Sequence, residues 1–248
     1  MPNLMRTSNP TLNDKIFREE GIALGRTMTL DGTVNKTGLL LIFAAASAAW
    51  AWRTISQSPE WAFLLALMGA CGGMIFVFLT VFQKSWAPIT APIYALLEGL
   101  VLGTLSQLFE RRYPGIAIQA VTLTFATLFS LLLLYRARVI RVTDKFRLGV
   151  VAATGGIAFF YFFTFILGLF GIHFSIIYGS TLIGIGFSVF VVIIAALNLV
   201  LDFDFIETGV TARAPKYMEW YGAFALLVTL VWLYFEILRL LAKMRERR

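Results

Sequence analysis

Acidic residues are scarce in this chain, yet several of them gather in one short stretch near the C-terminus. The chain holds 14 Asp and Glu residues against 21 Lys and Arg, so its formal net charge is +7 at pH 7. The acids of the stretch are Asp202, Asp204, Glu207 and Glu219. Only Arg213 and Lys216 oppose them, and carboxylates clustered at the mouth of a pore concentrate cations. The acidic corner therefore predicts cation binding, with Asp202 nearest to the apolar run that precedes it. For Asp204 and Glu207, a solvated loop neutralised by the two basic residues is an equally open interpretation.

Glu98 is the most informative single acid, because it stands inside an apolar run. It lies about ten residues into ITAPIYALLEGLVLGTLSQLF, which is close to the middle of a helix that crosses a bilayer. An ionised carboxylate at that depth is costly unless it is paired or hydrated. Glu98 is therefore predicted to sense protons and to bind a cation such as Ca²⁺, whose preferred ligands are oxygen atoms. The alternative is a neutral Glu98 that hydrogen-bonds to a neighbouring helix.

The composition indicates the elements that must position these acids. Hydrophobic residues make up 59% of the 248 residues and charged residues only 14%, whereas a soluble domain is nearer to half apolar and a quarter charged. The apolar runs are continuous and about 20 residues long, which is typical of membrane-spanning helices and not of barrel strands. We therefore predict an all-α integral membrane protein in contact with the lipid bilayer. The basic residues are scattered over the loops, which argues against nucleic-acid binding.

Seven spans are predicted after a soluble leader, residues 1–36, which lacks the apolar core of a signal peptide. Residues 37–248 form a single transmembrane domain. The expected spans are residues 38–52, 61–82, 88–109, 115–135, 148–170, 178–201 and 220–241. More Lys and Arg residues flank the side of the N-terminus than the opposite side, so the N-terminus is expected in the cytoplasm. A six-span version with a re-entrant C-terminal segment remains an alternative.

Catalytic and cofactor chemistry finds no support in the sequence. The single cysteine, Cys71, and the single histidine, His173, do not make a zinc or iron–sulfur ligand set. No phosphate-binding loop and no nucleophile–base motif is present. We expect neither an enzyme nor a cofactor, and no metal beyond transient Ca²⁺ at Glu98 and Asp202.

Further residues suggest how the acids are supported. Gly99 and Gly103 form a GxxxG pattern beside Glu98, which predicts close approach of a second helix. Asn198, one helical turn before Asp202, is a candidate inward-facing partner of that acid. Glu236 and Arg239 are spaced for an interface ion pair.

Gate or latch candidates complete the set of predicted site residues. Lys84 is a lone cation between the second and third spans, and Arg213 and Glu219 flank the corner before the last span.

Four stretches of the chain resemble one known family. They are SNPTL in the leader, YALLEGLVLG in the third span, IGIGFSVFVVIIAALNLVLDFDFIETG in the sixth, and EWYGAFALLVTLVWLYFEILRLL in the last. The chain resembles the Bax inhibitor-1 (transmembrane BAX inhibitor motif) family, and its bacterial YccA-like branch in particular. The resemblance implies a bundle of seven helices with a central C-terminal helix, in a bacterial inner membrane. It also implies a pH-sensitive Ca²⁺ leak or, alternatively, the control of a membrane protease or a stress response through protein contacts of the leader.

The family's proton-sensing residues have poor counterparts in this sequence. In the family, two aspartates in the last two helices, latched by an arginine, respond to protons. The resemblance places these positions near Ala195 or Ala196 and near Thr229. A shifted match makes Asp202 and Glu236 the counterparts, but a straight hairpin would put them at opposite membrane faces. No arginine stands near the start of the third span.

The residues themselves therefore suggest a different set for a proton-gated leak. We expect Glu98 to work with Asp202, aided by Asn198. Asp202 and Asp204 would then form the cytoplasmic gate.

Overall fold

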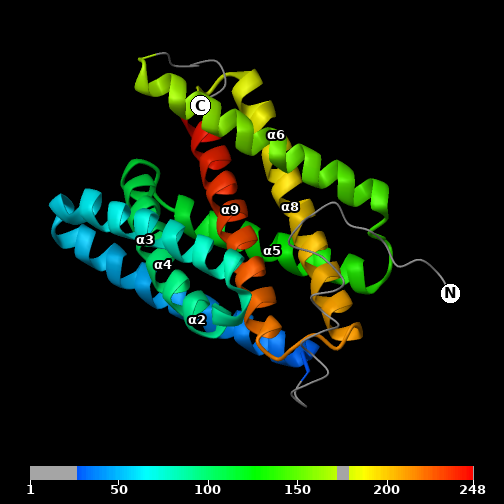
Figure 1. Ribbon diagram of the computed structural model, residues 1–248. Coiled ribbons are helices and arrows are strands. Elements are labelled where there is room, and N and C mark those ends of the chain that lie inside the picture. The colour runs from blue at the N-terminus through cyan, green and yellow to red at the C-terminus, as the bar shows by residue number, and fades with distance from the viewer. Residues whose placement is uncertain (1–26, 172–178, 248) are drawn as a thin grey trace. The chain divides into compact units, whose positions relative to one another are not determined.

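Seven long helices make up most of the part of the chain that the structure describes (Figure 1). The computed structural model describes residues 27–171 and 179–247. The helices are α2 (Leu30–Gln57), α3 (Ala62–Phe82), α4 (Ala87–Arg112), α5 (Ile116–Arg136), α6 (Asp144–Leu169), α8 (Leu182–Thr211) and α9 (Met218–Glu246). The 3-10 helices η1 (Pro59–Trp61) and η2 (Lys84–Trp86) precede α3 and α4. All seven long helices are apolar and long enough to cross a membrane, which confirms the predicted all-α membrane fold.

The first helix begins earlier than the sequence pattern predicts. Thr29 caps it, because its hydroxyl oxygen accepts a hydrogen bond of 3.1 Å from the backbone N–H of Gly32. Residues 30–36, expected in the soluble leader, therefore form the first turns of α2. The rest of the leader up to residue 26, and His173, which follows α6 in the chain, lie outside the described residues.

Helix α8 ends later than predicted, and this changes the acidic corner. The expected sixth span stops at Leu201, whereas α8 continues to Thr211. No proline interrupts the chain from Leu182 until Pro215, so the helix propagates beyond the apolar run. It ends near Arg213, whose φ of 54° is left-handed. Three of the four corner acids consequently lie on α8, and Glu219 lies in the first turn of α9, so all four are helical.

Two compact units share these helices. The first combines the chain up to Thr104 with Asp204–Leu227, and the second combines Leu105–Phe203 with Val228–Arg248. Helix α9 contributes to both units and is the most buried span: 61% of its most apolar window is buried, against 44% for α4 and 39% for α8. Its 29 residues form one unbroken helix of about 43 Å. The predicted central C-terminal helix is thus present, as one helix long enough to cross a membrane.

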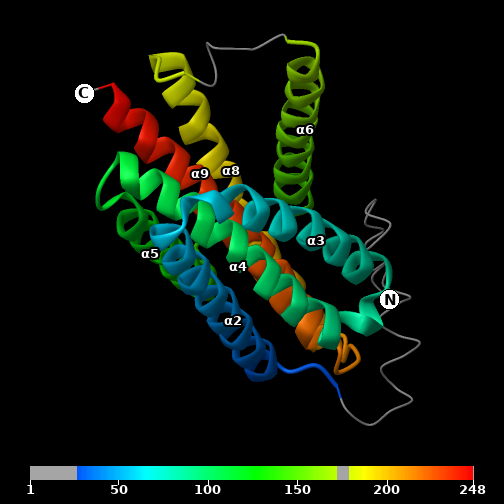
Figure 2. The same cartoon turned by 90° about the vertical axis from the view of Figure 1, so that its left-hand side faces the viewer.

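Glycine residues allow the helices of the first unit to pack closely. A Cβ built on Gly99 or Gly103 of α4 would fall on the backbone carbonyl oxygens of Ala44 or Ala48 in α2, which confirms the close approach expected from the GxxxG pattern. On α3, a Cβ on Gly69 would lie 2.6 Å from the carbonyl oxygen of Leu97 in α4. Figure 2 shows α2 and α3 on either side of α4.

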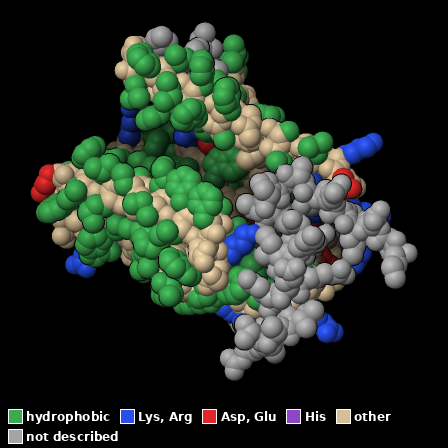
Figure 3. Space-filling view, viewed as in Figure 1, with side chains coloured by type: hydrophobic (Ala, Val, Ile, Leu, Met, Phe, Trp, Pro, Cys, Tyr) green, Lys and Arg blue, Asp and Glu red, His purple; other side chains and the backbone are tan. Residues whose placement is uncertain are grey.

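Hydrogen bonds and apolar side chains hold the second unit together. Glu110 at the end of α4 accepts hydrogen bonds from the backbone N–H groups of Gly115 and Ala117, and thereby caps α5. Ile157 of α6 and Val191 of α8 belong to one buried cluster, against which Trp232 of α9 packs. Elsewhere large apolar side chains are exposed, as expected of a surface that faces lipid, and Figure 3 shows them over much of one face.

Candidate functional site

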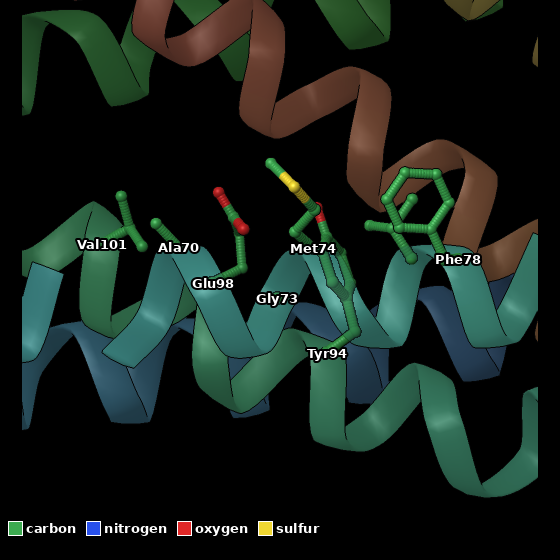
Figure 4. A pocket seen from close by; sticks show the side chains of 8 residues that line it. Ala70, Gly73, Met74, Phe78, Tyr94, Glu98 and Val101 are labelled. Carbon is green, nitrogen blue, oxygen red and sulfur yellow. The ribbon is translucent and has the colours of Figure 1, made fainter. Parts of the chain in front are cut away.

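Glu98 lines an apolar groove of the first unit. The groove lies along α3 and α4 and has a volume of about 450 Å³ (Figure 4). It is lined by Ala70, Gly73, Met74, Val77, Phe78, Tyr94, Glu98 and Val101. Glu98 stands near the middle of α4, which agrees with the depth predicted from the sequence. It is the only acidic side chain in the lining.

Few polar groups surround the carboxyl group of Glu98. Among the described residues, it makes no hydrogen bond or ion pair. Gly73 leaves room for it, because a Cβ at that position would lie 3.2 Å from Oε2 of Glu98. The alternative interpretation, a glutamic acid bonded across helices, therefore finds no partner in the described part of the chain. An apolar site favours the neutral form of a carboxyl group, and a cation close by favours the ionised form.

Asp202 belongs to the second unit, where it meets Thr229 of α9. The Thr229 hydroxyl forms a hydrogen bond with the Asp202 carboxyl group. The other oxygen, Oδ2, is buried and has no hydrogen-bond partner among the described residues. Thr229 is the position where the family resemblance puts a second aspartate. Asp202 thus pairs with Thr229 and not with Glu236, the other residue of the shifted match, whose partners are Tyr161 and Arg239.

The expected helpers of Asp202 lie elsewhere. The amide group of Asn198 donates to the hydroxyl oxygen of Thr154, at 2.8 Å, and to the carbonyl oxygen of Ile194, also at 2.8 Å. Both of its N–H donors are therefore used, and the expected support of Asp202 by Asn198 is wrong. Asp204 follows Asp202 by two positions on helix α8, so the two side chains point apart and do not share one gate-like face. Glu207 is exposed near the end of α8.

Glu219 is the best-paired acid of the predicted set. Its side chain is fully buried at the start of α9. Oε1 accepts hydrogen bonds from the backbone N–H of Thr29 at 2.8 Å, from the Thr29 hydroxyl at 2.7 Å and from Nζ of Lys216 at 2.7 Å. Oε2 forms an ion pair with Nζ of Lys36. Gly32 packs beneath the carboxylate, where a Cβ would overlap it.

This arrangement, which we call the Glu219 cluster, consists of Thr29, Gly32, Lys36, Lys216 and Glu219. It joins the start of α2 to the start of α9. The segment before α2 is tied to the same corner, because the backbone N–H of Met28 donates to the carbonyl oxygen of Ala214 at 2.7 Å. The cations that pair with Glu219 are Lys36 and Lys216, and the latch role of Glu219 stays a prediction.

The other two latch candidates lie apart from the Glu219 carboxylate. Nζ of Lys84 stands 5.5 Å from the ring centre of Tyr221, a cation–π contact. Arg213 is exposed at the end of α8. Lys36 is the cation that sequence reasoning missed, because it was assigned to the soluble leader. The signal that could have found it is the cap residue Thr29, which starts the helix before Lys36.

A partly buried ion pair lies in the second unit. Arg239 donates to Glu236 at 3.2 Å, as the spacing predicts, and the side chain of Glu236 is 2% exposed whereas that of Arg239 is 39% exposed. The place of this pair at the membrane interface stays a prediction. Tyr161 of α6 donates a hydrogen bond of 3.1 Å to Glu236. Lys243, one turn further, is also buried and donates to the hydroxyl oxygen of Ser188 at 2.9 Å. Sequence reasoning missed Tyr161 and Lys243.

Thr29→Val is expected to lower the free energy of unfolding by about 1–2 kcal/mol, the usual cost of losing an N-cap side chain. The substitution removes both the cap of α2 and the hydroxyl that donates to Glu219. Thr29→Ser keeps the hydroxyl and should restore most of the loss. Thermal unfolding of the purified protein in detergent measures both variants, and equal melting temperatures for Val and Ser would contradict the role of the hydroxyl.

The fold and the buried acids define a class of protein: a polytopic membrane protein with a central C-terminal helix and ionisable side chains inside its helices. A family model described as Bax inhibitor 1 like matches residues 9–246, and the chain belongs to that family. No curated protein and no solved structure matches the chain. Within the described residues, no three His, Cys, Asp or Glu side chains gather in a way that would hold a metal ion.

Proposed function

We propose that this protein is a cation leak pathway of a bacterial inner membrane, with its N-terminus in the cytoplasm. It passes Ca²⁺ or another cation down its gradient under the control of protonation, and it catalyses no reaction. The observation that carries the proposal is Glu98, a carboxyl group without a described partner, in an apolar groove near the middle of a spanning helix. Acidic residues inside membrane spans are rare, and they mark ion pathways and proton relays.

Protonation gives such a carboxyl group two states with different affinities for cations. When it is ionised, it attracts a monovalent cation 4 Å away by about 4 kcal/mol at an effective dielectric constant of about 20. When it is neutral, that attraction is lost. Glu98 thus serves both as a cation ligand and as a proton sensor.

Asp202 supplies a second oxygen site in the proposed pathway. Its buried Oδ2 has no hydrogen-bond donor among the described residues, so this oxygen is available to a proton or a cation. A leak requires cation binding that is weak and transient.

Glu98→Gln should reduce the flux of Ca²⁺ into proteoliposomes by about tenfold or more, the factor that corresponds to 1.4 kcal/mol of lost attraction. Wild-type flux should rise as the pH rises through the titration of this carboxyl group, because only the ionised form attracts the ion. In the Gln variant that rise should disappear. Glu60→Gln, at an exposed acid of η1, is the matched control and should behave like the wild type.

Other outcomes of the flux measurement would redirect the proposal. If Glu98→Gln left both flux and its pH dependence unchanged, Asp202 would become the residue to replace next. If no flux occurred at any pH, the alternative of a modulator of a membrane protease or stress response would be favoured. Deletion of the leader, residues 1–36, would then be expected to abolish the modulation of the protease or of the stress response.

A further inference from the structure

We propose that the groove around Glu98 binds lipid-soluble organic cations, that is, monovalent cations whose charge is carried by an apolar, partly aromatic body. This inference rests on the same Glu98 site as the proposed function and adds a class of ligand to it. Three observations carry it: the size of the groove, the side chains that surround the carboxyl group, and the direction from which a ligand can enter.

The groove is larger than an inorganic ion needs. Its volume of about 450 Å³ falls inside the range of about 300–1,000 Å³ that is typical of pockets for small organic molecules. A dehydrated metal ion would occupy a small part of that space and would need several oxygen ligands. The groove provides one carboxyl group and the hydroxyl of Tyr94, and its other lining residues are apolar or glycine.

The lining suits an organic cation in its chemistry as well. A lone carboxylate in an apolar site is neutralised by one positive charge, which a monovalent organic cation supplies. The ring of Phe78 and the thioether of Met74 add polarisable surface, which attracts cations and apolar groups. Figure 4 shows the side chains of Glu98, Met74 and Phe78 on the same side of the α3–α4 pair.

The groove opens sideways from the helices. Met74 is 62% exposed and Phe78 is 54% exposed, and both lie in the interior of the apolar helix α3. We take these exposed apolar side chains to border the hydrocarbon region, because α3 is apolar and long enough to cross a membrane. A ligand that approaches along this route must itself dissolve in lipid. A hydrophobic cation with dispersed charge dissolves in lipid, whereas a hydrated metal ion does not.

The test measures the binding of tetraphenylphosphonium to the full-length chain in nanodiscs of zwitterionic lipid. We expect saturable binding above the partitioning into empty nanodiscs. Glu98→Gln should raise the dissociation constant by about tenfold or more, which corresponds to 1.4 kcal/mol. Glu60→Gln should leave the dissociation constant at the wild-type value.

A second variant tests the groove without changing its charge. Ala70→Phe places an aromatic ring at an exposed position of the lining and should also weaken binding by about tenfold or more. Cys71→Phe, at an exposed neighbour outside the lining, is its control and should bind as the wild type does. Melting temperatures of all variants show that a loss of binding does not arise from unfolding. The inference is overturned if Glu98→Gln and Ala70→Phe bind the cation like the wild type, or if binding equals partitioning into lipid alone.

The measurement separates this inference from the proposed function. Binding that depends on Glu98, in a protein without Ca²⁺ flux, would support the organic-cation site and refute the leak. Flux that depends on Glu98, without saturable binding of tetraphenylphosphonium, would support the leak and refute the organic-cation site.

Discussion

Replacement of Glu219 by Ala is expected to lower the free energy of unfolding by about 3–5 kcal/mol, the range found when one partner of a buried ion pair is removed. Glu219 is fully buried, and the side chain of Lys36 is only 18% exposed. Without the carboxylate, this ammonium group is left in a largely dry site. The backbone N–H and the hydroxyl of Thr29 lose their acceptor at the same time.

Thermal and denaturant unfolding in detergent would measure this effect. Glu60→Ala removes an exposed acid of η1 and provides the comparison, with an expected change within about 1 kcal/mol. Glu219→Gln keeps the side-chain volume but not the charge, so it should retain most of the destabilisation. A Glu219→Ala variant as stable as Glu60→Ala would show that the Glu219 cluster contributes little to the fold.

Gly103→Ala is expected to destabilise the protein, although alanine is the better helix former. The added Cβ would collide with the backbone carbonyl of Ala48 in α2, and a backbone atom cannot move aside as a flexible side chain can. Such overpacking typically costs about 1–3 kcal/mol. The two helices must separate at this point, and the nearby Gly99–Ala44 contact must loosen with them.

Gly149→Ala is the matched control, because the same substitution in α6 meets nothing within 4 Å. Here alanine should raise the stability by about 0.5–1 kcal/mol, because a helical glycine loses more conformational freedom on folding. Opposite signs of the two changes in unfolding free energy are the expected result. If both substitutions stabilised the protein, the close contact of α2 and α4 would be refuted.

Hydropathy was sufficient to predict the number and the order of the spans, because the membrane imposes one apolar length on each of them. It could not predict where the helices end. The start of α2 depends on the cap at Thr29, and the end of α8 depends on the absence of proline before Pro215. Capping and helix propagation are local effects that hydropathy does not measure.

The candidate site was likewise predictable from the sequence only in part. Glu98 was predicted because a single acid in an apolar run is visible in the sequence itself. The partners of the other acids were not visible. Lys36 and Glu219 meet across 183 positions, and Thr229 meets Asp202 only once α8 and α9 have packed. Tertiary pairing of this kind depends on which helix faces turn towards each other, and one sequence alone does not contain that information.

The Glu219 cluster also bears on the order in which the protein is assembled during synthesis. Translation at roughly 5–20 residues per second delivers Lys36 on the order of ten seconds or more before Glu219. Throughout that interval, the first span is in the membrane while the ammonium group of Lys36 lacks the Glu219 carboxylate. The final span therefore completes the first one, and a chain released by the ribosome before α9 would lack the carboxylate that pairs with Lys36.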